Sequence, residues 1–156
     1  MSDRMETRPQ LKPAPLAPRI LAAILDSTFV FLGFFYIVWT WGESSPNGAR
    51  ALTGIPALLL MLGILAYWVF PEWLLGSTMG KWACDLQVTT LRGGNISLMQ
   101  SLKRNLLRTL DFFPFYLTGF VTASITPNRQ RLGDLWAKTI VVRKKEIKQE
   151  TAQSVP

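Results

Sequence analysis

Long apolar runs alternate with short polar segments along this chain of 156 residues. Residues 20–41 form a long apolar run in which Asp26 is the only charged residue, and residues 51–70 carry no charge at all. A helix that crosses the hydrocarbon core of a bilayer needs about 20 such residues, and each run supplies them. A short polar loop, residues 42–50, joins the two runs. The pattern therefore predicts two transmembrane helices.

A third apolar stretch, residues 98–126, is interrupted by Arg104, Arg108, Asp111 and Pro114. Two interpretations stay open for it. The stretch is either a re-entrant helical hairpin that turns near Pro114 or a third plain membrane span. Each arm of a hairpin would have roughly a dozen residues, too few to span a bilayer, so the hairpin would have to pack against the two spans.

The distribution of Lys and Arg favours the hairpin. Four lie in the N-terminal arm through Arg19, one in the loop 42–50, four in residues 74–105 and seven after residue 126. The positive-inside rule then places the N-terminus, residues 74–105 and the C-terminus in the cytoplasm. A third span would put the most basic part of the chain outside, which the rule disfavours.

Two short β-branched segments, "DLQVTT" and "KTIVVRKK", have the alternating pattern of strands. If residues 98–126 enter the membrane and return, these strands can pair on the cytoplasmic side as a small β-ribbon. Ser97 is placed to cap a helix that begins at Leu98. The predicted fold class is an all-α integral membrane protein with two transmembrane helices, a re-entrant or third membrane helical segment, and a small cytoplasmic β-ribbon.

The two ends of the chain differ in composition from its middle. Residues 1–18 are polar and proline-rich and suit a flexible arm, and residues 144–156 suit a disordered polar tail. The predicted organisation is therefore one membrane domain, residues 19–143, between an arm and a tail.

The composition of the chain limits the catalytic, metal-binding and disulfide chemistry that it can support. The chain has no His and a single cysteine, Cys84, so it lacks the commonest general base and metal ligand and can form no internal disulfide. We expect no enzymatic activity, no cofactor and no metal site. The net charge is +7, but acidic residues interleave the basic tail "RKKEIKQE", so we expect anionic membrane lipid as its partner and no nucleic acid.

Asp26 is the unusual residue of the first span. A carboxylate inside a spanning helix costs a few kcal/mol unless it is paired or hydrated, and it is by default a candidate functional residue. Arg19 lies two helical turns before it, on the same face. Either Asp26 handles an ion or a proton, or it pairs with an arginine and fixes helix docking. Both interpretations stay open, and the structural one is favoured.

Further charged residues follow in two groups. Arg104, Arg108 and Asp111 share one helix face, and a second group comes just after the hairpin. Arg104 and Arg131 are interpreted as ordinary interfacial arginines that reach lipid phosphates. The candidate site, an ion or proton cluster or a structural ion-pair cluster facing the cytoplasm, consists of Arg19, Asp26, Arg108, Asp111, Arg129 and Asp134.

The stretch "GSTMGK" is not interpreted as a phosphate-binding loop. That motif needs four residues between its glycines and Ser or Thr after the lysine, whereas Gly76 and Gly80 enclose three and Trp82 follows Lys81. A tight turn at the membrane exit, with the backbone packed closely at the glycines, is predicted instead.

Four blocks, taken in order, resemble the RDD family of bacterial multi-pass membrane proteins, named for one arginine and two aspartates. They are "PRILAAILDS", "GSTMGKWACDLQV", "SLKRNLLRTLD" and "NRQRLGDLWAKTIVV". The resemblance points to Arg19, Asp26 and Asp134 as the named set. Trp136 and Lys138 depart from the small residues usual at their positions. What the resemblance implies is a role in transport, with cation/proton antiport suggested for some members.

Two functions follow as hypotheses for this bacterial inner-membrane protein. The first is transport of a monovalent cation or proton with Asp26 as the protonatable site, which demands an oligomer because two spans cannot enclose a pathway alone. The alternative is a non-catalytic accessory or scaffold subunit that binds a membrane-protein partner or anionic lipid at the cytoplasmic face. In that case Asp26→Asn should impair folding or partner recovery without any effect on ion flux.

Overall fold

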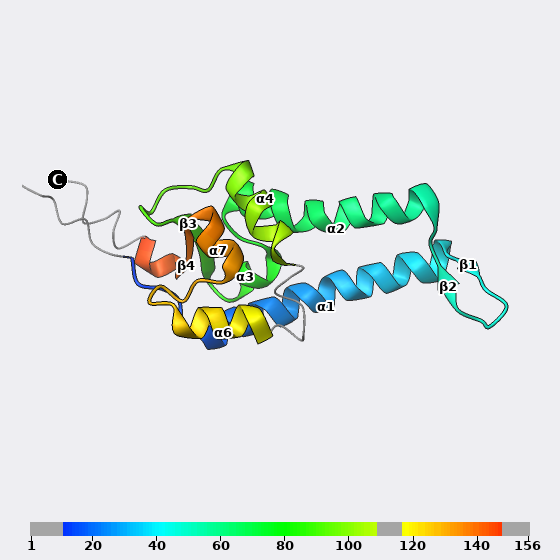
Figure 1. Cartoon of the computed structure of the whole chain (residues 1–156), viewed down its shortest axis with the longest axis horizontal. Helices are drawn as coiled ribbons and strands as arrows, with labels where there is room; N and C mark the ends of the chain where they lie inside the picture. Colours follow the sequence, from blue (N-terminus) through cyan, green and yellow to red (C-terminus); the bar gives the residue numbers. More distant parts are fainter. Residues whose placement is uncertain (1–10, 109–116, 148–156) are drawn as a thin grey trace, which may run out of the picture.

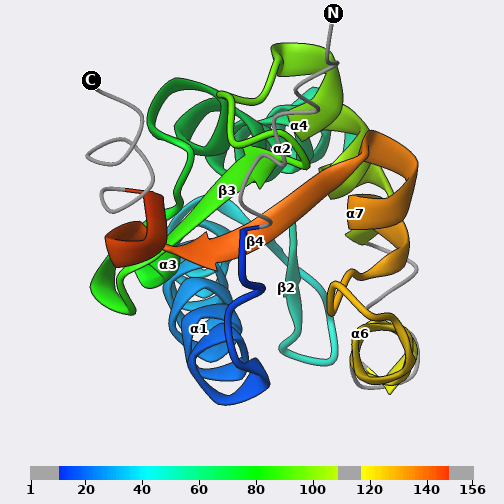
Figure 2. The same ribbon diagram turned by 90° about the vertical axis from the view of Figure 1, so that its left-hand side faces the viewer.

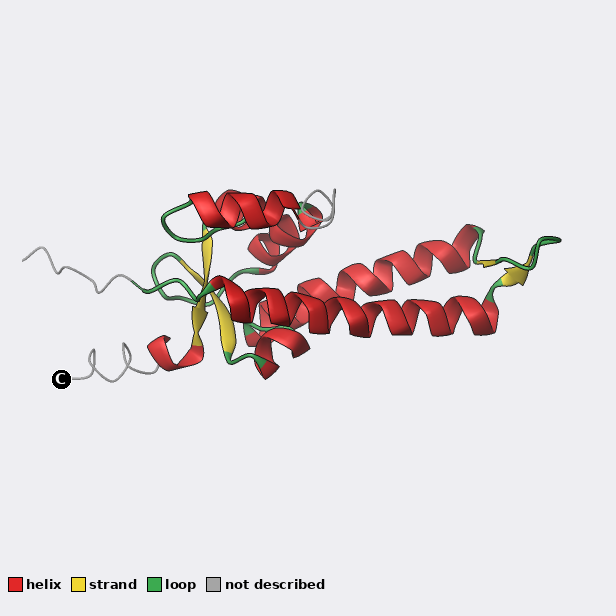
Figure 3. Cartoon of the chain, turned by 90° about the horizontal axis from the view of Figure 1, so that it is seen from below, coloured by secondary structure: helices red, strands yellow, loops and turns green. Residues whose placement is uncertain are grey.

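Two long helices dominate the structure, a computed structural model that describes residues 11–108 and 117–147 (Figure 1). They are α1 (Leu16–Trp41) and α2 (Gly54–Leu75), and both are long and apolar enough to cross a membrane. Figure 3 shows them running from a compact end to the short hairpin of β1 (Glu43–Ser44) and β2 (Arg50–Ala51). The two predicted apolar helices are confirmed.

The outer surfaces of these helices are apolar over most of their length. Phe31 of α1 is 64% exposed, and Met61 of α2 is 69% exposed, with many similar neighbours. A soluble monomer rarely exposes contiguous apolar patches beyond a few hundred Å². The exposed faces instead match the hydrocarbon interior of a bilayer.

Helix α2 continues past the end predicted at residue 70. It runs through Pro71 and Glu72 to Leu75, and Gly76 ends it with a φ of +65° in the left-handed region. The predicted span ended at residue 70 because it was defined as a run without charge. The extra turn carries Glu72, a charged residue inside the second long helix but outside the predicted span.

At the compact end, strands β3 (Leu86–Thr90) and β4 (Thr139–Arg143) pair in antiparallel register, with Val88 opposite Val141. The predicted β-ribbon is thereby confirmed. Figure 2 shows the ribbon crossing the end of α1. Its apolar side chains pack with Ala22 of α1 into the main core.

The ends of the domain lie outside the predicted boundaries of residues 19 and 143. Ala14 is 1% exposed, and its backbone N–H donates to the carbonyl of Val141 at 2.9 Å. At the other end, the N–H of Lys144 donates to the carbonyl of Asp85 at 3.0 Å. The flexible arm predicted for residues 1–18 therefore needs correction over residues 11–18, which are part of the fold.

Four further labelled helices occupy the same end: α3 (Met79–Ala83), α4 (Leu98–Leu106), α6 (Leu117–Ile125) and α7 (Leu132–Ala137). Ser97 caps α4 as predicted, in a capping box with Gln100. Because β4 pairs with β3, residues 98–126 begin and end at the same end of the spans, as a re-entrant segment requires. Residues 109–116, with the predicted turn, lie outside the described part, and membrane insertion of this segment stays a prediction.

Candidate functional site

Three helices meet at Asp134, the aspartate of α7, which is 3% exposed. Its Oδ2 accepts from Arg19 Nη2 of α1 at 2.9 Å, and its Oδ1 lies 3.0 Å from Arg104 Nη1 of α4. The backbone N–H of Arg131 donates to the same carboxylate at 3.2 Å. Arg19 also donates to the carbonyl of Arg129. The start of the first span is thus tied to the segment that precedes the last strand.

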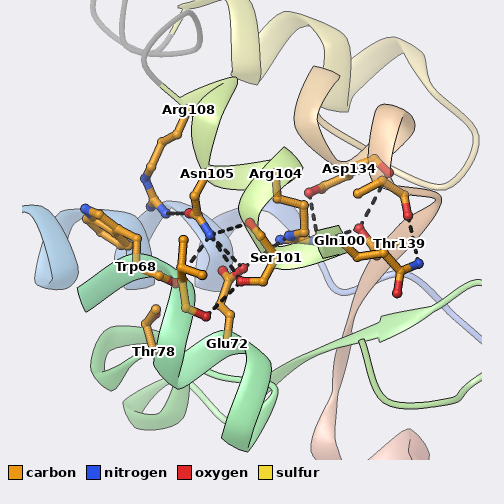
Figure 4. A network of polar contacts seen from close by, with 12 residues as sticks. Trp68, Glu72, Thr78, Gln100, Ser101, Arg104, Asn105, Arg108, Asp134 and Thr139 are labelled. Carbon is orange, nitrogen blue, oxygen red and sulfur yellow. Dashed lines mark hydrogen bonds and ion pairs between the residues drawn. The ribbon is translucent and has the colours of Figure 1, made fainter. Parts of the chain in front are cut away.

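Glu72 of α2 forms the second centre of charge, and it is 1% exposed. Lys81 of helix α3 (Met79–Ala83) donates to its Oε1. Its Oε2 accepts from Arg104 Nε and from Asn105 Nδ2, each at 3.2 Å. Figure 4 shows Arg104 reaching both Glu72 and Asp134. We call these six residues, Arg19, Glu72, Lys81, Arg104, Asn105 and Asp134, the paired cluster.

The paired cluster is anchored to the β-ribbon and to the spans by neutral hydrogen bonds. Arg104 Nη1 donates to Thr139 Oγ1 at 2.7 Å, at the start of β4. Ser101 Oγ donates to the carbonyl of Val69 at 2.9 Å, and Asn105 Nδ2 to that of Trp68 at 3.3 Å. A buried network fixes one arrangement when every member is satisfied, so these contacts dock α4 against the end of α2.

The pKa values of two groups outside the spans, Asp134 and Lys81, reflect both burial and the neighbouring charges of the cluster. Burial by itself would raise the pKa of the Asp134 carboxyl, but Arg104, Arg19 and Arg131 together lower it from 3.8 to about 2. Burial, followed by the positive charge of Arg104, lowers the pKa of the Lys81 ammonium. The nearby carboxylate of Asp26 opposes that change in the pKa of Lys81 by favouring the charged form.

Asp26 occupies a separate position, which we call the Asp26 pocket, formed with Tyr67, Thr78 and Gly80. Asp26 is 1% exposed. Its Oδ1 accepts from the Gly80 N–H at 2.7 Å and from the Tyr67 hydroxyl at 3.0 Å, and its Oδ2 accepts from the Thr78 hydroxyl. None of the ion pairs between described residues includes Asp26. All of these donors are neutral.

Gly80 makes this close approach possible. A Cβ at this position would lie 2.8 Å from Asp26 Cγ and closer still to the carbonyl oxygen of Ala22. Only a residue without a side chain lets the backbone N–H of α3 reach the carboxylate. The predicted close packing of the backbone at the glycines of "GSTMGK" is confirmed here, and its place at a membrane exit stays a prediction.

The candidate residues predicted from the sequence separate into these two regions. Arg19 and Asp134 meet in the paired cluster, whereas the predicted neutralisation of Asp26 by arginines is wrong within the described residues. Arg129 contributes its backbone carbonyl to Arg19. Arg108 lies beside the cluster, with its guanidinium 3.3 Å from the centre of the Trp68 ring. Asp111 lies outside the described residues.

Two residues need a different account from the one predicted. Arg104 was expected to reach lipid phosphates, but it is 8% exposed and bridges both carboxylates, so that interpretation is wrong. Glu72 was missed. The signal for it was present, because Glu72 is the one charged residue in α2, and a carboxylate in such a helix is rare and usually paired.

Comparison with known proteins gives one match to a protein family. The family model described as the RDD family matches residues 13–138. No curated protein and no solved structure matches the chain. The matched region covers both long helices, the Asp26 pocket and all members of the paired cluster.

Proposed function

Because the chain belongs to the RDD family and has two apolar helices that indicate a membrane protein, we propose that it takes part in transport of a monovalent cation or a proton. The proposal assigns the ion-binding role to Asp26. It places the protein in the bacterial inner membrane, as an assembly of several copies or with a membrane-protein partner.

The observation that carries the proposal is the set of neutral groups around Asp26. A carboxylate held by arginine is already neutralised, as Asp134 is. Asp26 instead forms no ion pair within the described residues and lies next to the hydroxyl oxygens of Tyr67 and Thr78. Carboxylate and hydroxyl oxygens are hard ligands that suit hard cations. The pocket therefore supplies both a charge and the oxygen atoms that a bare cation would need.

A pathway for the ion requires more than this chain alone. The two spans contribute one carboxylate pocket near one end, and their remaining faces are apolar and exposed. Ionic pathways through membranes are lined by polar groups from several helices. We infer that copies or partners pack around α1 and α2 to complete a route to Asp26.

The proposed orientation places the β-ribbon in the cytoplasm. Both ends of the described chain lie next to the ribbon, since Ala14 and Lys144 make backbone hydrogen bonds there. The basic residues outside the loop 42–50 lie on the segments that join this end. The positive-inside rule then supports cytoplasmic N- and C-termini.

Ion flux in proteoliposomes tests the proposal. The wild type and Asp26→Asn would be reconstituted, and internal pH followed with a dye under imposed Na⁺, K⁺ or Li⁺ gradients. Asp85→Asn is the matched control, because it makes the same change at an exposed residue with a φ of 56°, a conformation that asparagine adopts readily. Cation-dependent proton movement that survives in Asp85→Asn and disappears in Asp26→Asn is expected.

A wild type that folds and reconstitutes but moves no ions would contradict this proposal. The second candidate function would then apply, that of an accessory subunit that binds a partner protein or anionic lipid at the ribbon end. The exposed tryptophans of this end favour it: Trp82 is 71% exposed beneath Lys144, and Trp136 is 51% exposed beneath Lys103. Tryptophan next to lysine is typical of surfaces that meet lipid headgroups.

A further inference from the structure

An open cavity lies beside the paired cluster, where the ends of α1 and α2 meet α4 and α7. Five basic side chains line it, against two carboxylates, Glu72 and Asp134. The five come from four different segments of the chain: Arg19, Lys81, Arg104, Arg108 and Arg131. A concentration of positive charge on converging elements is the usual basis for binding an anion.

The buried charges at the floor of this cavity leave an excess of positive charge. Arg19, Lys81 and Arg104 are 4%, 7% and 8% exposed, and they face the buried carboxylates of Glu72 and Asp134. Both carboxylates are engaged in ion pairs with these side chains. Three buried basic groups therefore stand against two buried carboxylates, and this balance favours an anion over a further cation.

Arg131 adds positive charge at the mouth of the cavity. Its side chain is half-buried, and none of the ion pairs between described residues includes it. Its backbone N–H holds Asp134, so the residue is fixed at the edge of the paired cluster. Arg131 therefore brings a positive charge to the edge of the paired cluster, where it also favours the ionised form of Asp134.

Arg108 lines the same cavity, and two of its contacts fix its orientation. Its guanidinium lies over the Trp68 ring, and Nη1 donates to Asn105 Oδ1 at 3.3 Å. Stacking on an aromatic ring orients a guanidinium group. The guanidinium groups of Arg131 and Arg108 thus line one cavity above a positively charged floor.

We propose that this cavity binds a phosphate group, held by the guanidinium groups of Arg131 and Arg108. The planar fork of arginine matches two phosphate oxygens at once, and such charge-assisted hydrogen bonds are among the strongest in proteins. The cavity lies where both apolar helices end, and helices that span a bilayer would bring this end to the depth of lipid headgroups. An anionic phospholipid is therefore the source we favour, and a free phosphate in solution is the other.

The inference deepens the second candidate function, binding of anionic lipid at the ribbon end, and its assay is independent of ion flux. The full chain in neutral detergent would be titrated with phosphatidylglycerol, phosphatidylcholine or inorganic phosphate. Bound lipid would be counted by native mass spectrometry, and inorganic phosphate by isothermal titration calorimetry. Arg131→Gln removes the mouth charge, and Arg131→Lys keeps it without the fork. Arg92→Gln, at an exposed turn away from the cavity, is the matched control.

Wild type and Arg92→Gln should bind phosphatidylglycerol alike and phosphatidylcholine more weakly. Arg131→Gln should bind phosphatidylglycerol about tenfold more weakly, as expected for loss of one charge-assisted hydrogen-bonding group, and Arg131→Lys should fall between them. Inorganic phosphate binding with the same dependence on Arg131 would assign the cavity to a soluble phosphate. Equal losses in Arg92→Gln and Arg131→Gln, or no binding of either ligand by the wild type, would overturn the proposal.

Discussion

Two neighbouring regions of this protein bury carboxylates in opposite ways. In the paired cluster, Glu72 and Asp134 are held by lysine and arginine side chains from other elements. In the Asp26 pocket, the carboxylate accepts hydrogen bonds from two hydroxyls and a backbone N–H. Both solutions satisfy a buried charged group. Only the second leaves the charge itself without a countercharge from the described residues.

This difference suggests a structural role for one region and a chemical role for the other. Removing one partner of a buried ion pair strongly destabilises a protein, because the other charge then stays buried without compensation. The paired cluster therefore suits a joint between helices that must not change. A carboxylate held by neutral donors can gain and lose a cation or proton with smaller rearrangement, which suits a site that cycles between two states.

The largest loss of stability is expected from Glu72→Gln, which removes the charge of one of the two carboxylates in the paired cluster. Every hydrogen-bond partner of this carboxylate is a donor: Lys81, Arg104 and Asn105. Whichever way the new amide points, its NH₂ group faces a donor and two buried cations lose their anion. We expect a loss of about 3–5 kcal/mol in the free energy of unfolding.

Denaturant unfolding of the detergent-solubilised protein measures this loss. The exposed Glu43 of β1 offers the matched control, and Glu43→Gln should stay within about 0.5 kcal/mol of the wild type. A Glu72→Gln variant as stable as that control would show that the ion pairs do not hold α2, α3 and α4 together.

The next largest loss of stability is expected at Gly80, which belongs to the Asp26 pocket and precedes Lys81 of the paired cluster. In Gly80→Ala the new methyl would meet Asp26 Cγ at 2.8 Å and the backbone of α1, so α3 must move away and its N–H must leave the carboxylate. We expect a loss of about 3 kcal/mol, the upper part of the range for overpacked sites. Gly63→Ala in α2 meets no atom of the described residues within 4 Å and should be near neutral in the same unfolding measurement.

Acid should weaken the paired cluster through Asp134. Its pKa in the folded protein, about 2, lies below the usual 3.8, so its ionised form stabilises the fold fully above about pH 4. That contribution is lost as the pH falls through about 2, and it amounts to about 2 kcal/mol. The free energy of unfolding, measured at several pH values, should therefore depend less on pH in Asp134→Asn than in the wild type over this interval. Identical pH dependence in the two proteins would contradict the ion pairs at Asp134.

Much of the fold could be predicted because it depends on simple patterns. The apolar length of residues 20–41 and 51–70 marks α1 and α2, and the β-branched alternation of "LQVTT" and "TIVVR" marks the ribbon. Ser97 and Gln100 carry the capping signal of α4 in four residues of sequence. These signals are local, so they can be recognised in the sequence without knowledge of the tertiary structure.

The pairing of the charges could not be predicted in the same way. Arg19 lies two turns from Asp26 on one helix, yet its partner is Asp134, and the sequence separation of that pair is 115 residues. Which carboxylate an arginine reaches depends on how α7 docks, and sequence spacing does not contain that docking. Glu72 was lost for a local reason, because the second span was defined as a run without charge and so ended at residue 70.

The smallest effect on stability is expected from Asp26→Asn, although it makes the same chemical change as Glu72→Gln. The new Oδ1 can keep the hydrogen bonds from Tyr67 and Gly80, and the new NH₂ can donate to Thr78, whose hydroxyl rotates from donor to acceptor. The free energy of unfolding should therefore change by less than about 1 kcal/mol. Cation-dependent flux should nevertheless disappear, because the charge is gone. A variant that unfolds as readily as Glu72→Gln would remove the distinction between the two regions, and Asp26 would then belong to the structural joint.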